Sequence, residues 1–252
     1  MPVDPATLAL LFATGVVGGV VSVVVSLASL VTYPVLIALG VPPVAANVTN
    51  TVALTFNGLG AALGAGPELR GQRPLLLRLA AIAAAGGATG AAILLLLPGR
   101  TFELIAPLLI AGAAVAVLIQ PRLVLHARFR PRGITPPTAA AYYATTTYSG
   151  YFGAGGGILA IVALSGIIER PLVEVNAAKS ALAGVANGTA AIAFILWGPV
   201  RWLDAIPLAA GLFVGGLIGP AIVRTLPPGI FRRAVVVCGF GVAALLALRA
   251  LG

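Results

Sequence analysis

The chain has 252 residues, of which 60% are hydrophobic and 8% charged, and its mean hydropathy is +1.10. A water-soluble domain carries about 25% charged residues, so this composition excludes a soluble fold. The net charge is +9, but the basic residues fall mainly between apolar blocks, which indicates membrane topology rather than a nucleic-acid-binding face.

Apolar blocks of bilayer-spanning length follow one another along the chain. A membrane-spanning helix needs about 20 residues, and turn signals such as Pro42-Pro43 and Pro98-Gly99 separate the blocks. The N-terminus lacks the positive region of a secretory signal peptide, so we expect the first block to be retained. We predict an all-α membrane protein with about eight apolar helical segments, at residues 7–40, 44–66, 75–97, 102–120, 138–168, 175–198, 204–225 and 231–250.

The widest gap between blocks, 121–137, holds four arginines and His126. We interpret it as a basic cytoplasmic linker between a first transmembrane repeat, 1–120, and a second, 138–252. Matched positions lie 129 or 130 residues apart in the two repeats: Asn57 and Asn187, Gly86 and Gly215, Pro98 and Pro227. Such repetition predicts two homologous halves.

The first block of each repeat, 7–40 or 138–168, is too long for one comfortable span and too short for two. Serines interrupt the first of these blocks, and the run SGYFGAGGGIL at 149–159 interrupts the second. Irregular backbone in lipid is tolerated only where it lines a cavity or is buried in protein. We predict that each repeat opens with a broken or re-entrant helix, and that the breaks mark a binding site.

Arginine placement favours the re-entrant arrangement. If every block crosses once, nine arginines lie on the cytoplasmic side and five outside; if the first block of each repeat is re-entrant, the numbers become eleven and three. The second distribution follows the positive-inside rule better. It gives each repeat three crossings, so the halves would be inverted repeats, although a helix broken in the membrane could also cross fully.

Lys179 is the only lysine, and it lies inside an apolar block. A cation at the centre of a membrane helix costs about 2.5 to 3.5 kcal/mol on insertion scales, so it usually faces a cavity or a partner. An anionic substrate is the partner we predict. The alternatives are that Lys179 snorkels to the interface or pairs with Glu174.

Polar and glycine residues gather on the same matched segments. Amides and hydroxyls can donate hydrogen bonds to oxyanions, although helix–helix hydrogen bonding is the competing explanation. Glycines let backbone N–H groups approach a ligand. The predicted substrate-binding residues are Lys179, Asn47, Thr49, Asn50, Asn176, Ser180, Ser26, Ser29, Gly155, Gly156 and Gly157.

Catalysis is not expected. The lone histidine, His126, lies in the basic linker, so a membrane-embedded nucleophile has no histidine base and a histidine metal site has too few ligands. The single cysteine, Cys238, has no partner in the chain. We therefore expect no enzyme activity, no cofactor and no metal.

Two stretches resemble a known family. SLASLVTYPVLIALGVPPVAANVTN at 26–50 and GYFGAGGGILAIVALSG at 150–166 resemble the duplicated signature of the sulfite exporter TauE/SafE family, also called the toluene sulfonate uptake permeases. The resemblance covers essentially the whole chain. It implies secondary transport of sulfur-containing anions such as sulfite or sulfonates, across the inner membrane of a prokaryote, with multiple passes.

The resemblance implies a small anionic substrate, the lipid bilayer and a coupling proton or cation as partners, and no nucleic acid. A homo-oligomer, a passive anion channel and a non-transporting scaffold subunit stay open. One departure affects the site: Ser26, Leu27, Ala28 and Ser29 stand where the family's first half has a Gly-Xaa-Gly-Gly-Gly run. Hydroxyls here replace bare backbone, so the name of the substrate does not carry over.

Overall fold

The computed structural model describes residues 4–109, 111, 112, 115, 133–153 and 155–225. Every regular element in these ranges is helical, as predicted. The helices are α1 Pro5–Val25, α2 Ala28–Ala38, α3 Pro43–Gly64, α4 Gly66–Leu69, α5 Arg73–Leu96, α7 Pro136–Tyr151, α8 Gly156–Ser165, α9 Leu172–Trp197 and α10 Trp202–Thr225, and residues 99–109 are helical as well. The predicted segment 231–250, Cys238, His126 and most of the linker lie outside the described residues.

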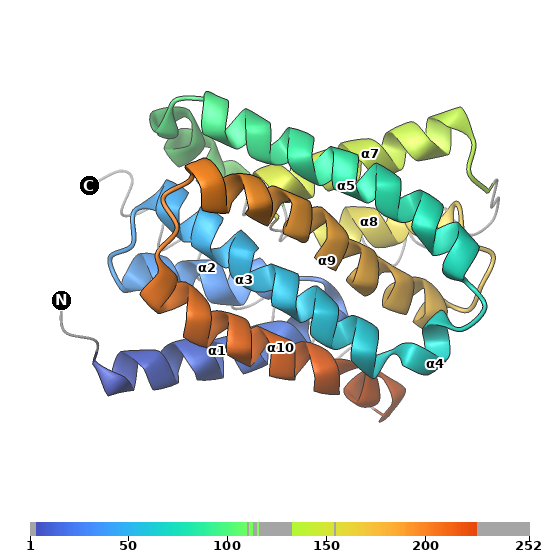
Figure 1. Cartoon of the computed structure of the whole chain (residues 1–252), viewed down its shortest axis with the longest axis horizontal. Helices are drawn as coiled ribbons and strands as arrows, with labels where there is room; N and C mark the ends of the chain where they lie inside the picture. The colour runs from blue at the N-terminus through green and yellow to red at the C-terminus, as the bar shows by residue number, and fades with distance from the viewer. Residues whose placement is uncertain (1–3, 110, 113–114, 116–132, 154, 226–252) are drawn as a thin grey trace.

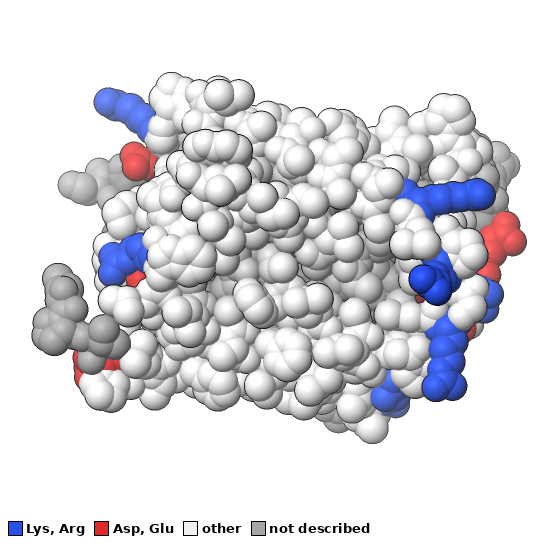
Figure 2. All heavy atoms as spheres, viewed as in Figure 1, with Lys and Arg blue, Asp and Glu red and all other residues white. Residues whose placement is uncertain are grey.

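Four helices, α1, α5, α9 and α10, are long and apolar enough to cross a membrane. Only 39–44% of the residues in their apolar windows are buried inside the protein, so more than half of each apolar window faces outward. Figure 2 shows charged side chains at the two ends of the long axis and a largely uncharged surface between them. Lipid is the solvent in which such a surface is stable.

α3 has comparable length, 22 residues, or about 33 Å at 1.5 Å per residue. Five of its six polar side chains lie inside the bundle and are at most 5% exposed: Asn47, Thr49, Asn50, Thr51 and Asn57. α3 therefore forms the polar centre of the bundle, and helices with apolar outer faces surround it. The chain is a multi-pass helical membrane protein.

The two halves of the chain interdigitate. α1 packs on α10, α10 on α3, α3 on α9, α9 on α5, and α5 on α7. Along this series, helices from the first half alternate with helices from the second. A close approach at Gly15, where a Cβ would collide with the backbone of α10, brings α1 and α10 together.

Helices at corresponding places in the two halves, such as α3 and α9 or α5 and α10, run in opposite directions. Figure 1 shows α1, α3 and α10 starting at the end that carries the N-terminus, and α5, α7 and α9 starting at the opposite end. α2 returns toward the start of α1, so α3 begins at the end where α1 began; α8 and α9 repeat this arrangement at the other end (Figure 1). We call the two ends the amino end, where α1 starts, and the basic end, where Arg70, Arg73, Arg170 and Arg224 lie at helix termini and turns.

Candidate functional site

The first predicted break lies at Ser26, between α1 and α2. Ser26 has a φ of 65°, in the left-handed region, and its N–H donates to the Ser22 carbonyl at 2.9 Å. No glycine or proline stands at this break, and a left-handed L-residue costs roughly 1 to 2 kcal/mol. The surrounding packing must hold this conformation, because the local sequence does not favour it.

The second predicted break lies between α7 and α8, where glycines supply the required backbone. Gly153 has a φ of 80° and Gly155 a φ of 75°. Gly155 is the N-cap of α8, Gly156 is its first residue, and Gly156 packs against the Ser149 side chain. Glycine adopts positive φ at no steric cost, so the sequence signal for this break was direct.

The two breaks contact each other. A Cβ added at Gly157 would lie 2.7 Å from the Ser26 Cβ, and one added at Gly153 would lie 3.6 Å from the Ser29 Oγ. The N-termini of α2 and α8 therefore approach the same region, and no side chain caps either one. A helix N-terminus carries partial positive charge and free N–H groups, so both ends favour an anion there.

A cavity of about 50 Å³ lies beside the two breaks. Its polar lining residues come from both halves of the chain: Ser22, Ser26, Ser29, Asn57, Ser149, Lys179, Ser180 and Asn187. Among the described lining residues, Lys179 is the one that carries a charge. These residues thus place a single cation and many neutral hydrogen-bonding groups around one cavity.

Lys179 is 3% exposed, and its ammonium contacts the first break. Nζ donates to the Ser26 Oγ at 2.7 Å and to the Ser22 carbonyl at 3.2 Å. The ion pairs found in the described part of the chain join arginines to acidic residues near helix ends and do not include Lys179. An ammonium has three donors, so one position remains for a group in the cavity.

Two predicted site residues instead cap carbonyl groups freed by the breaks. The Asn47 Nδ2 donates to the Tyr151 carbonyl at 2.8 Å, and the Asn176 Nδ2 donates to the Val23 carbonyl at 2.9 Å. The two asparagines are 129 residues apart, since 176 − 47 = 129. Each one satisfies the last turn of the other half's interrupted helix, where carbonyls lack intrahelical partners.

Asn50 and Thr49 are not lining residues of the cavity, and each binds a neighbouring segment. Asn50 donates to the Ser29 Oγ at 3.2 Å and accepts from the Thr32 hydroxyl at 2.6 Å, so it fixes α2 on α3. The Thr49 Oγ1 accepts from the Arg201 backbone N–H at 3.0 Å, which ties α3 to the turn before α10.

Of the predicted site residues, Lys179, Ser180, Ser26, Ser29 and Gly157 line the cavity. Sequence reasoning missed further polar lining residues, namely Ser22, Asn57, Ser149 and Asn187. Asn57 and Asn187 had a signal, because they form the matched Asn-Gly pairs of the two repeats. Ser22 also had one, because it precedes Ser26 by one helical turn.

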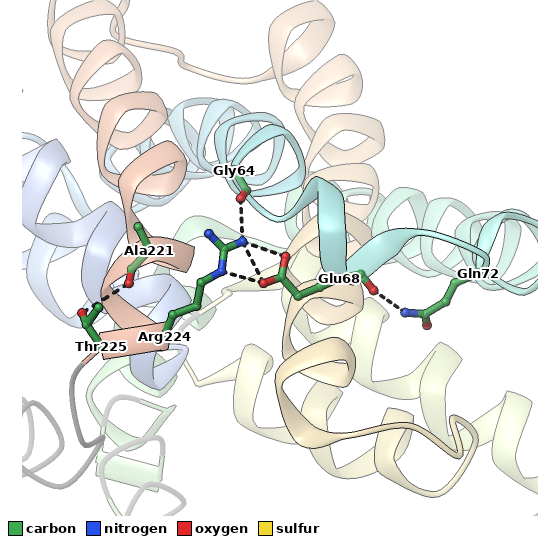
Figure 3. Close-up of polar contacts among 6 residues, drawn as sticks. All are labelled: Gly64, Glu68, Gln72, Ala221, Arg224 and Thr225. Atoms are coloured by element: carbon green, nitrogen blue, oxygen red, sulfur yellow. Dashed lines mark hydrogen bonds and ion pairs between the residues drawn. The ribbon is translucent and has the colours of Figure 1, made fainter.

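A second, smaller pocket shares one lining residue with the cavity. This pocket of about 10 Å³ is lined in part by Val23, Glu68, Asn176 and Ser180, and Ser180 lines the central cavity as well. Glu68 forms an ion pair with Arg224 that joins α10 to α4 (Figure 3). The Arg224 Nε donates to the Glu68 Oε1 at 2.8 Å, and the Arg224 Nη2 donates to the Glu68 Oε2 at 2.9 Å.

An aromatic cluster packs beside the second break. Phe152, which directly precedes the glycines of the second break, makes edge contacts with Tyr33 at 5.8 Å and Phe102 at 5.5 Å between ring centroids. All three side chains are at most 3% exposed. The packed rings therefore hold the chain one residue before Gly153, which lines the cavity.

Comparison with known proteins agrees with this architecture. The family model described as "Sulfite exporter TauE/SafE" matches residues 11–246. The chain is 25% identical to a "Probable membrane transporter protein ORF9" of Sinorhizobium sp, covering 84% of this chain and 81% of that protein. It is 24% identical to a "Probable membrane transporter protein" of Haemophilus influenzae, covering 92% and 91%.

No solved structure matches the chain. The family match covers most of the sequence and confirms the resemblance inferred from the duplicated motifs. This chain belongs to the sulfite exporter TauE/SafE family.

Proposed function

We propose that the chain is a secondary transporter that carries small oxyanions, with sulfite as the leading candidate, across the cytoplasmic membrane of a prokaryote. The observation that carries the proposal is the cavity with one buried cation and two converging helix N-termini beside it. A buried charge without a partner is costly. An oxyanion bound in the cavity would neutralise Lys179 and accept hydrogen bonds from the hydroxyl and amide groups around it.

The cavity size favours a small anion. A buried water needs roughly 10 to 15 Å³ of such volume, and the cavity measures about 50 Å³. It therefore has room for about four water-sized atoms, which is the size of sulfite. An aromatic sulfonate is too large for a cavity of this volume, so we propose a small inorganic oxyanion or a short alkyl sulfonate as substrate.

Alternating access is the mechanism we propose. The opposite directions of matched helices in Figure 1 support an inverted-repeat interpretation. A central cavity lined by both halves suits a site that the two sides of the membrane reach in turn. In the described residues, five arginines, Arg70, Arg73, Arg78, Arg170 and Arg224, mark the basic end and two, Arg100 and Arg201, the amino end. The positive-inside rule then puts the basic end in the cytoplasm.

Binding and flux test the proposal directly. Purified protein is unfolded by heating with sulfite, thiosulfate, methanesulfonate or acetate, and an anion that stabilises the fold is a ligand. An anion at 100 times its Kd adds about 2.7 kcal/mol to the free energy of unfolding. Uptake of the same radiolabelled anions into proteoliposomes should saturate, and the anion loaded inside should accelerate it. Flux without saturation would indicate a passive channel, and no flux would indicate a scaffold.

Variants locate the site. Lys179→Ala should abolish both stabilisation and saturable uptake, and uptake at the wild-type level would remove Lys179 from the mechanism. Ser180→Ala and Ser165→Ala form a matched pair, because each hydroxyl donates to the carbonyl four residues earlier, at 3.0 and 2.6 Å. Ser180 lines the cavity and Ser165 does not, so Ser180→Ala should weaken binding while Ser165→Ala should not.

A further inference from the structure

We propose, on the basis of the transport function above, that Lys179 carries the coupling proton, so that each monovalent oxyanion crosses together with one proton. The proposal starts from the surroundings of Nζ. Both of its partners in the described structure, the Ser26 Oγ and the Ser22 carbonyl, are neutral acceptors. A neutral amine keeps two N–H groups for these partners and directs its lone pair to the remaining position.

In the part of the chain that the structure describes, Lys179 is the only titratable residue of the cavity lining. The neighbouring elements hold their charged and titratable side chains elsewhere. On α9 itself, Glu174 is bonded to Arg170 and Gln72 near the basic end. α2, α3 and α8 contain no charged residue, and the groups on the other neighbours are Asp4 before α1, Glu68 on α4, Arg73 and Arg78 on α5, and the tyrosines of α2 and α7. None of them is a lining residue.

The absence of a carboxylate from the cavity lining links the proton to the anion. When the site holds an anion, the ammonium has an opposite charge beside it in a water-poor space. When the anion leaves, the ammonium would remain as an unpaired buried charge, which proteins avoid by losing the charge. Proton and anion therefore bind more strongly together than separately, and the coupling is reciprocal.

The binding step balances as follows. A hydronium ion gives one proton to the Nζ lone pair, so that one N–H bond forms, one O–H bond of hydronium breaks, and water leaves. The third N–H of the new ammonium then donates to the oxyanion. Release on the other side reverses both steps. One proton and one monovalent anion cross, and no net charge moves.

The anion of a strong acid distinguishes proton-coupled transport from simple permeation of the protonated acid. Methanesulfonate stays ionised at every working pH, so it cannot carry a proton by itself, and it has only about five non-hydrogen atoms, close to what the cavity holds. Full-length protein is reconstituted in vesicles that contain a pH-sensitive dye. Inward methanesulfonate flux should acidify the lumen by one proton per anion. External acid should drive accumulation, and a potassium diffusion potential should not change the rate.

Methanesulfonate uptake without a change in lumen pH, or uptake that follows the membrane potential, would overturn proton coupling while leaving the proposed transport function intact. No uptake of any tested anion would overturn both proposals. Lys179→Arg gives a second test, because the guanidinium stays charged. This variant should bind methanesulfonate in the thermal assay but lose acid-driven accumulation; wild-type proton flux would refute the role of Lys179. If the variant does not fold, the number of protons that the wild type carries per methanesulfonate still decides whether transport is coupled to protons.

Discussion

Replacement of Ser26 separates its hydroxyl from its backbone conformation. Ser26→Ala and Ser26→Gly both remove the Oγ that accepts from the Lys179 Nζ at 2.7 Å. A hydrogen bond to a charged group contributes about 1.5 to 3 kcal/mol. Both variants should therefore bind the anion more weakly than the wild type, because Lys179 loses one of its two acceptors.

The two variants should differ in stability. The φ of 65° at position 26 stays unfavourable for alanine but is free for glycine. The free energy of unfolding should thus be higher for Ser26→Gly than for Ser26→Ala, by about 1 kcal/mol. In the middle of α5 the order should reverse, with Thr89→Ala more stable than Thr89→Gly by about 1 kcal/mol, because glycine disfavours a helix.

Reversible unfolding by sodium dodecyl sulfate in mixed micelles measures these differences through the fluorescence of Trp197 and Trp202. Thr89 is the control, because its hydroxyl is also hydrogen-bonded, donating to the Ala85 carbonyl, but the residue lies in regular helix. If alanine proves more stable than glycine at position 26, as it should at position 89, then the left-handed conformation at the break is refuted.

Two further perturbations test the contacts around the cavity. Gly157→Ala places a Cβ 2.7 Å from the Ser26 Cβ, whereas Gly66→Ala meets nothing within 4 Å. The first should cost about 1 to 3 kcal/mol and reduce uptake, and the second should stay within about 0.5 kcal/mol of the wild type in the same unfolding assay. Glu68→Gln and Arg224→Gln should show a coupling of up to about 1 kcal/mol in a double-mutant cycle, because the Arg224 side chain is 41% exposed and solvent screens the pair. Purely additive effects would show that the Arg224–Glu68 ion pair does not stabilise the protein.

The sequence allowed prediction of the helical class, of two broken blocks and of a buried lysine at the centre. These features follow from composition and from segment length, which depend on the membrane rather than on detailed packing. The glycines at 153 and 155 located the second break, because only their backbone adopts positive φ easily. Ser26 could not be located in this way, since its conformation is held by contacts with Gly157 and Lys179 from the other half.

The roles of the asparagines were equally beyond prediction from sequence. Asn47 and Asn176 carry the same side chain as Asn57, yet the first two cap carbonyls and the third lines the cavity. All three lie on polar faces of apolar helices, so the pattern alone does not distinguish them. The difference depends on the partner that each one meets. Asn47 and Asn176 reach a carbonyl of the opposite half, whereas the Asn57 Nδ2 donates to the Ser22 Oγ of its own half.

The alternation of helices from the two halves affects how the protein is made. α1 is synthesised first, but its main neighbour, α10, begins only at Trp202. During translation α1 must therefore wait in lipid without this neighbour. It is the most apolar of the four candidate spans, which lets it persist alone in the bilayer until the last described helix arrives and the bundle assembles.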